Sequence, residues 1–193
     1  PLLPLSYFTI MKKILPLLFL GILMSTIHCT PKTEVDGTSI DKLIWSDEFE
    51  GDFIDTTKWR FETGDHGWGN NEWQDYQPQS SDNVEVKDGT LRITARKTGP
   101  GQRVGDYTST RINSRESFLY GRIEIRAKMP EYKGPGIWPA LWMLGQNIGY
   151  LGWPLCGEID LMEYISSNPD SVLMTIHSQA NNHMNGTQLS SGF

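Results

Sequence analysis

From Leu43 onward, apolar and polar residues alternate along the sequence and no helical repeat is present. The clearest stretch is 121–129, whose apolar members are Ile123, Ile125, Ala127 and Met129. Successive side chains of a strand point to opposite faces, so these four would share one face. Residues 91–96 and 172–177 alternate in the same way. The pattern predicts β-strands.

Turn-forming residues separate these runs, at Asp88-Gly89, 99–101, 133–136 and 168–170. Short strands with frequent turns and no amphipathic helix predict an all-β fold, a two-sheet sandwich or jelly roll. The sequence has no internal repeat and no glycine-rich phosphate loop. The polar and aromatic stretch 64–71 is predicted to be a loop, and loops often carry binding residues.

The N-terminal region has the pattern of an export signal. Met11 is followed by Lys12 and Lys13, and then by an uncharged apolar run that ends at Ile27. Such a run is too short for a comfortable transmembrane helix and predicts a signal peptide over residues 11–28. Residues 1–10 are then interpreted as translated upstream sequence, with Met11 as the true start.

Cys29 ends the apolar run and precedes a small polar stretch. This resembles a bacterial lipoprotein signal, in which the cysteine becomes a lipid anchor, although His28 matches poorly the small residue usual at that position. Ordinary secretion is the alternative. Either way we expect an extracytoplasmic protein, secreted or held at the cell surface or outer membrane, with a linker over 29–42 and one domain, a monomer, over 43–193.

The formal net charge of −6 argues against a nucleic-acid partner, because phosphate binding needs a basic face. All seven tryptophans lie between Trp45 and Trp153. Indole rings either pack in a core or form platforms on which the apolar faces of sugar rings stack. Core packing is expected for at least half of them.

Three carboxylates fall within six residues, at Glu158, Asp160 and Glu163. On a regular strand the first two share a face, while Ile159 and Leu161 would point into the core. Glu163 lies five residues from Glu158, which is an odd offset. One β-bulge near 161–162 would return Glu163 to the acidic face.

Like charges repel, so this cluster costs stability unless it serves a function. Retaining glycoside hydrolysis needs two carboxyl groups about 5 Å apart, and a third can orient the nucleophile. Negative neighbours also raise the pKa of one member. The alternatives are a calcium site, whose ligands usually come from a loop rather than from alternate strand positions, and a solvated acidic strand.

Residues 157–164 (GEIDLMEY) resemble the active-site signature of glycoside hydrolase family 16 in its bulged form. Residues 136–144 (GIWPALWML), 45–49 (WSDEF) and 70–72 (NNE) resemble that family too. The similarity runs from about residue 43 to 177. It implies a concanavalin A-like jelly roll that continues past the strand of His177, so we expect the chain to be incomplete at the C-terminus.

The resemblance implies a role for each matching residue. Glu158 would be the nucleophile, Glu163 the acid/base, and Asp160 the carboxylate that supports Glu158. The substrate-binding residues would be Trp138, Trp142, His177, Asn71 and Arg111, although packing in the core is the alternative for the two tryptophans and a structural role for the histidine. No cofactor is expected for catalysis.

Many members of the family bind a structural calcium away from the cleft, and Glu50 with the carbonyl of Gly89 would be the ligands here. The bulged signature is similar to the laminarinase-like branch, which also includes agarases and carrageenases. The expected activity is endo-hydrolysis of a β-1,3- or β-1,3-1,4-glucan. Agarose or carrageenan as substrate, and a non-catalytic glucan-binding sandwich, are the alternatives.

Overall fold

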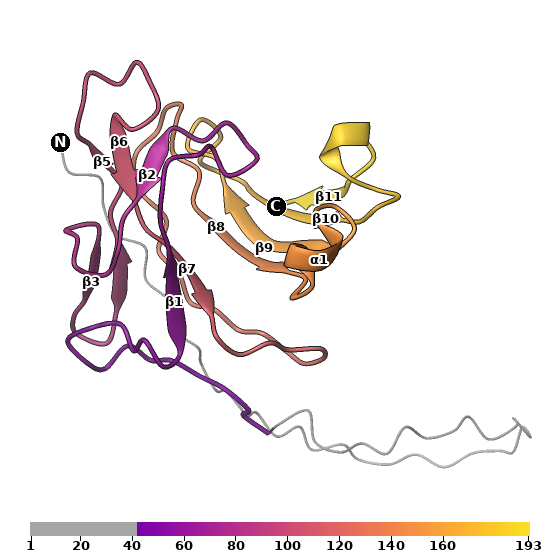
Figure 1. Ribbon diagram of the computed structural model, residues 1–193, viewed down its shortest axis with the longest axis horizontal. Helices are drawn as coiled ribbons and strands as arrows, with labels where there is room; N and C mark the ends of the chain where they lie inside the picture. The colour runs from indigo at the N-terminus through magenta and orange to yellow at the C-terminus, as the bar shows by residue number, and fades with distance from the viewer. Residues whose placement is uncertain (1–41) are drawn as a thin grey trace, which may run out of the picture.

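The computed structural model describes residues 42–193 (Figure 1). The predicted upstream segment 1–10, the signal peptide 11–28, the lipidated Cys29 and nearly all of the linker 29–42 therefore lie outside the described residues. Within the described range, none of the helices is long and apolar enough to cross a membrane.

The described residues fold almost entirely as strands and loops, which confirms the all-β class. The strands are β1 Trp59–Glu62, β2 Gln74–Tyr76, β3 Val84–Val86, β4 Leu91–Ile93, β5 Arg96–Lys97, β6 Tyr107–Ser109, β7 Arg111–Ser114, β8 Ala140–Leu144, β9 Glu158–Tyr164, β10 Val172–His177 and β11 Leu189–Gly192. A four-residue helix, α1 (Ile148–Leu151), and a 3-10 helix, η1 (His183–Asn185), complete the list.

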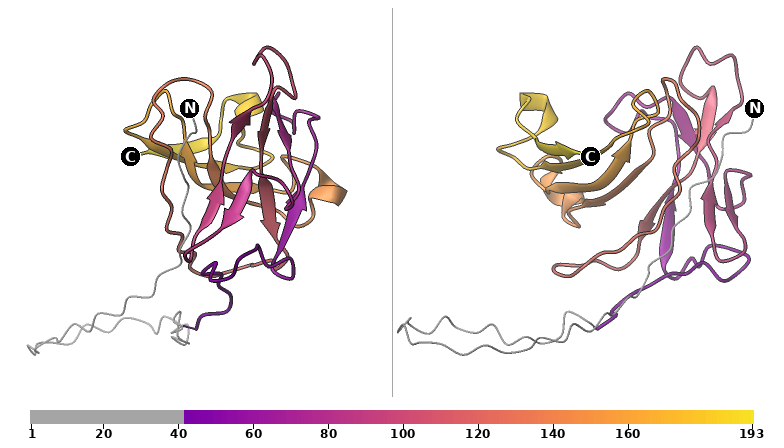
Figure 2. Two further views of the ribbon diagram at one scale, coloured as in Figure 1. Left: turned by 90° about the vertical axis from the view of Figure 1, so that its left-hand side faces the viewer. Right: turned by 180° about the vertical axis from the view of Figure 1, so that it is seen from behind.

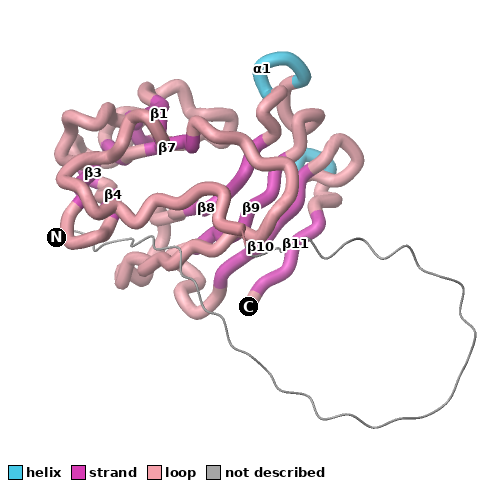
Figure 3. The backbone as a smooth tube through the Cα atoms, turned by 90° about the horizontal axis from the view of Figure 1, so that it is seen from below, coloured by secondary structure: helices cyan, strands magenta, loops and turns pink. Residues whose placement is uncertain are grey.

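The largest sheet is antiparallel and has the strand order β11-β10-β9-β8. Figure 3 shows these four strands side by side, and Figures 1 and 2 show them as a curved layer next to the strands from the first half of the chain. Those earlier strands form smaller groups: β1 with β7, β3 with β4, and β2 with β6 and β5. The two halves of the chain thus supply different layers.

The buried core lies among the earlier strands. It consists of Phe49, Ile54, Val86 and Leu91, against which partly buried Trp59, Phe61, Val84, Ile93 and Ile112 pack. Val86 and Leu91 are cross-strand partners in β3 and β4, and the ring of Phe49 stacks on Trp59 at 6.1 Å. The run 91–96 is confirmed as extended only in part: Leu91 is 1% exposed, but the run is divided between two strands, β4 and β5, which pair with β3 and β6.

The prediction of a strand over residues 121–129 is wrong for this structure. The segment contains no named strand, and Ile123 and Ile125 are 44% and 38% exposed. Alternation defines two faces of an extended segment, but a strand also needs a neighbour that supplies hydrogen bonds. Within residues 42–193, none of the strands β1 to β11 pairs with this segment.

The expected burial of Ile159 and Leu161 is also not observed. Ile159 is 44% exposed and Leu161 is half-buried, whereas Asp160 between them is 5% exposed. On β10, Met174 and Ile176 are exposed as well. The face of the sheet opposite Asp160 is therefore open, because no described segment covers these side chains.

Candidate active site

A bulge in β9 sets the direction of the acidic side chains. Against β8, Asp160 pairs with Trp142. Met162 pairs with the adjacent residue Leu141, so Leu161 is the extra residue. The register against β10 shifts at the same place. The predicted bulge at 161–162 is confirmed.

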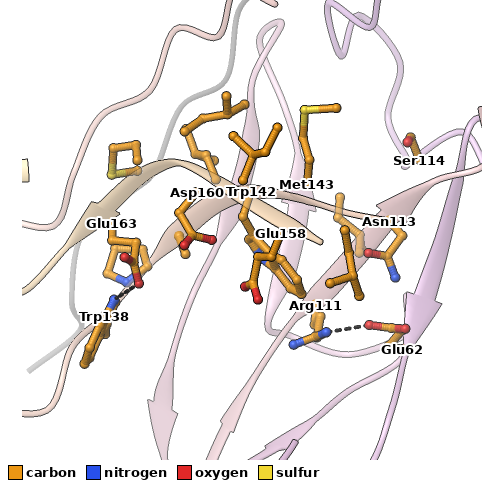
Figure 4. A pocket seen from close by; sticks show the side chains of 18 of the residues that line it. Glu62, Arg111, Asn113, Ser114, Trp138, Trp142, Met143, Glu158, Asp160 and Glu163 are labelled. Atoms are coloured by element: carbon orange, nitrogen blue, oxygen red, sulfur yellow. Dashed lines mark hydrogen bonds and ion pairs between the residues drawn. The ribbon is translucent and has the colours of Figure 1, made fainter. Parts of the chain in front are cut away.

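The bulge brings the three carboxylates to one side of the sheet. In Figure 4 the carboxyl groups of Glu158, Asp160 and Glu163 form a row along β9 and point the same way. All three line the large cleft between the layers. The side chains that the sequence predicted as a catalytic group are therefore together in the structure.

Asp160 is the buried middle member of this row. Its removal from water is the main cause that raises the pKa of its carboxyl group to about 7. The charges of Glu158 and Glu163 raise this pKa further, as does a hydrogen bond with Glu158. Below about pH 7 the site therefore holds a proton at its centre, where the protonated carboxyl can donate to Glu158.

Glu163 accepts hydrogen bonds from two neighbours. The indole Nε1 of Trp138 donates to its Oε1 at 3.0 Å, and the Thr175 hydroxyl donates to its Oε2 at 3.3 Å. Trp138 is 60% exposed, so its ring is open to a ligand in the cleft while its nitrogen holds the carboxylate. This arrangement suits a platform for a sugar ring beside a carboxylate.

Glu158 accepts a hydrogen bond from Trp153, whose Nε1 lies 2.5 Å from its Oε2. The sequence analysis did not single out this tryptophan. It precedes Glu158 by five residues and reaches it through the connection between α1 and β9, so no strand periodicity relates the two. The concentration of tryptophans near the acidic segment was the only signal that could have indicated it.

Arg111 on β7 lies between two indole rings. Its guanidinium carbon is 4.6 Å from the ring centre of Trp68 and 4.6 Å from that of Trp142. Its Nε donates to Oε2 of Glu62 at 2.5 Å (Figure 4). The two cation–π contacts hold the guanidinium and connect the loop 64–71 with β8.

The remaining predicted binding residues lie in two different places. His177 is buried beside Asp160, with Nε2 3.4 Å from Oδ2, and its Nδ1 has no hydrogen-bond partner among the described residues. Asn71 is exposed and has a φ of 54°, and its neighbours Asn70 and Glu72 line the cleft. The structure thus groups His177 with the carboxylates but not Asn71.

The expected calcium ligands, Glu50 and the carbonyl of Gly89, stay a prediction. Glu50 is exposed, and within residues 42–193 no group of three or more His, Cys, Asp or Glu side chains could hold a metal ion. Calcium takes six to eight oxygen ligands, many of them carboxylates. Glu50 and the Gly89 carbonyl alone fall short of that set.

A layered β-fold with a bulged strand of three carboxylates and flanking indole rings defines a carbohydrate-active protein. The chain belongs to the glycosyl hydrolases of family 16, whose family model matches residues 70–193. This membership confirms the resemblance found in the sequence.

Two curated relatives and one solved structure illustrate the similarity. A β-glucanase of Rhodothermus marinus is 46% identical over 152 residues, which cover 76% of this chain and 52% of the relative. A glucan endo-1,3-β-glucosidase of Cryptopygus antarcticus is 42% identical over 138 residues, 70% of this chain and 50% of the relative. This chain therefore spans about half the length of these relatives.

The solved structure is a mutant of a non-specific endo-β-1,3(4)-glucanase with an oligosaccharide at its active site. It matches with a TM-score of 0.72 and 37% identity, over 79% of this chain and 61% of the other. The likeness confirms the predicted jelly-roll sandwich.

Proposed function

We propose that the protein is a retaining endo-β-glucanase that hydrolyses β-1,3- or β-1,3-1,4-glucan. The observation that carries this proposal is the bulge in β9, which aligns Glu158, Asp160 and Glu163 on the cleft side. The glucanase relatives and the oligosaccharide at the active site of the solved structure support the substrate class.

The chemistry divides between the two outer carboxylates. Glu158 attacks the anomeric carbon while Glu163 donates its proton to the glycosidic oxygen, so the C–O bond breaks and a covalent glycosyl-enzyme forms. Glu163 then takes a proton from water, which displaces Glu158 and returns the original anomeric configuration. Asp160, whose raised pKa keeps it protonated below about pH 7, donates to Glu158 and fixes its orientation.

The test is to incubate the intact protein with laminarin, lichenan and agarose and to measure the reducing ends that are released. The Glu158→Gln variant is measured beside it. Activity on laminarin or lichenan that the substitution abolishes supports the proposal, and proton NMR of the first product should show the β-anomer. Hydrolysis of agarose alone would indicate a different polysaccharide. Binding of glucan without hydrolysis would contradict an enzymatic role.

The location of the protein is a second part of the proposal. A glucan is too large to enter a cell, and the export pattern of residues 11–28 together with Cys29 supports a secreted or lipid-anchored protein. Growth of expressing cells with radioactive palmitate, followed by fractionation, tests the anchor, with Cys29→Ser as the control. A cytoplasmic wild-type product would contradict both forms of export.

A further inference from the structure

Trp153, which binds Glu158, is itself packed against two histidines. Its ring stacks on that of His183, with centroids 4.7 Å apart and planes 28° apart. The ring of His177 meets Trp153 edge-on at 5.7 Å and lies 5.2 Å from the ring of His183. The three rings come from the segment before β9, from β10 and from η1, so segments distant in sequence converge on one indole.

The segment that carries His183 is firmly anchored although the residue itself is exposed. Asn182, which is 2% exposed, caps η1 by accepting a hydrogen bond from the backbone nitrogen of Asn185 at 3.3 Å. Its side-chain amide donates to the carbonyl oxygens of Ser178 at 3.0 Å and Gln179 at 3.3 Å. The imidazole is therefore held in place against Trp153 by a buried polar cap.

We infer that His183 is a positioning residue for the nucleophile and acts through Trp153. The inference rests on the proposed function, because it takes Glu158 as the nucleophile. The hydrogen bond from Trp153 to Glu158 forms only while the indole keeps its orientation, and the stacked imidazole covers the face over which the indole would otherwise turn. A carboxylate that loses this donor samples orientations from which attack on the anomeric carbon is slow.

Three single variants test the role of His183 in the intact protein. His183→Ala removes the stacked ring and should lower kcat on laminarin roughly 10-fold, with KM changed less than about 3-fold. His183→Phe keeps a flat ring and should restore kcat to within about 3-fold of wild type. Asn185→Ala, at an exposed residue of the same 3-10 helix, is the matched control and should leave kcat unchanged.

A double variant distinguishes an effect through Trp153 from a general one. Trp153→Phe keeps a ring but lacks the nitrogen that donates to Glu158, so adding His183→Ala to it should lower kcat no further. Full additivity of the two effects, or an equal loss in Asn185→Ala, would overturn the inference.

A crystal structure of His183→Ala gives a readout that does not depend on turnover. The inference expects the indole of Trp153 to have rotated away from Glu158, and an unchanged hydrogen bond would overturn it. Absence of wild-type hydrolysis would count against the proposed function, whereas activity that His183→Ala leaves intact would count against this inference alone.

Discussion

The Nε2 atom of His177 lies 3.4 Å from Oδ2 of Asp160, and both side chains are more than nine-tenths buried. Asp160 is thereby enclosed by β10 on one side and by Glu158 and Glu163 along its own strand. A carboxyl group in this setting is easier to protonate than in water, which agrees with the rise of its pKa to about 7.

Asp160 should make folding stability fall as pH rises. Between its usual pKa of 3.8 and its folded value of about 7, the folded state holds a proton that the unfolded state has lost. The stabilisation is therefore complete at low pH and disappears on going up through pH 7. Asp160→Asn should remove this dependence and raise the free energy of unfolding at pH 8 by roughly 1–3 kcal/mol.

Urea unfolding at pH 5 and pH 8 measures this difference. If Asp160→Asn and the wild type lose the same stability between the two values, the burial and charge argument for Asp160 is incorrect. The variant keeps the volume and one donor, so a change in packing is a small contribution.

Removal of the acid/base should leave a nucleophile that can still react. Glu163→Ala is expected to lower kcat on laminarin by roughly 10²–10⁴-fold, because the leaving oxygen is no longer protonated. For an aryl glycoside whose leaving group needs no proton, the rate of the first step, formation of the glycosyl-enzyme, should fall less. Sodium azide should then rescue turnover and give a β-glycosyl azide, whose anomeric configuration proton NMR determines. An α-azide would argue against retention.

Arg111 should stabilise the contact between the loop 64–71 and β8. Arg111→Met retains most of the length but loses both cation–π contacts and the ion pair with Glu62, so we expect a loss of roughly 1–3 kcal/mol in the free energy of unfolding. Hydrogen exchange should accelerate around Trp68. Arg111→Lys is the informative comparison, because it keeps the charge without the planar group. Equal stability of the methionine variant and wild type would contradict this role.

Leu91 should be among the most sensitive positions of the core. It is 1% exposed, and Leu91→Ala should cost about 2–5 kcal/mol through lost burial and the cavity that remains. Leu119→Ala makes the same chemical change at a residue that is 84% exposed and should alter stability by less than about 0.5 kcal/mol. Thermal unfolding of the two variants should therefore differ widely, and similar melting temperatures would contradict the assignment of the core.

The row of carboxylates could be predicted from the sequence because the face to which a strand side chain points depends on whether its offset along the strand is even or odd. Glu158 and Asp160 are two residues apart, and the odd offset of Glu163 required one bulge, which the register contains. The contacts of Trp153 and the pairing of Arg111 with Glu62 could not be predicted in this way. They join residues from different segments, and no local period encodes how loops bring such segments together.

Whether an apolar side chain is buried was harder to predict than the face of the strand to which it points. Ile159 points away from Asp160 as the alternation predicts, yet it is exposed, and Ile123 and Ile125 in the segment 121–129 are exposed as well. A period of two shows which side chains share a face, but what covers that face is decided by other parts of the fold. In β4, by contrast, Leu91 is buried because its cross-strand partner Val86 belongs to the same described core.

The extra residue in β9 has a consequence for how this site tolerates insertions and deletions. Deletion of Leu161 would remove the bulge with it and place the second glutamate four positions after Glu158, an even offset on a regular strand. All three acids would still point into the cleft. Loss of a single residue inside a central strand usually moves every side chain beyond it to the opposite face of the sheet. Deletion of Leu161 would instead leave the three carboxylates on one face. A β9 strand that is one residue shorter would therefore present the same chemical groups to the cleft.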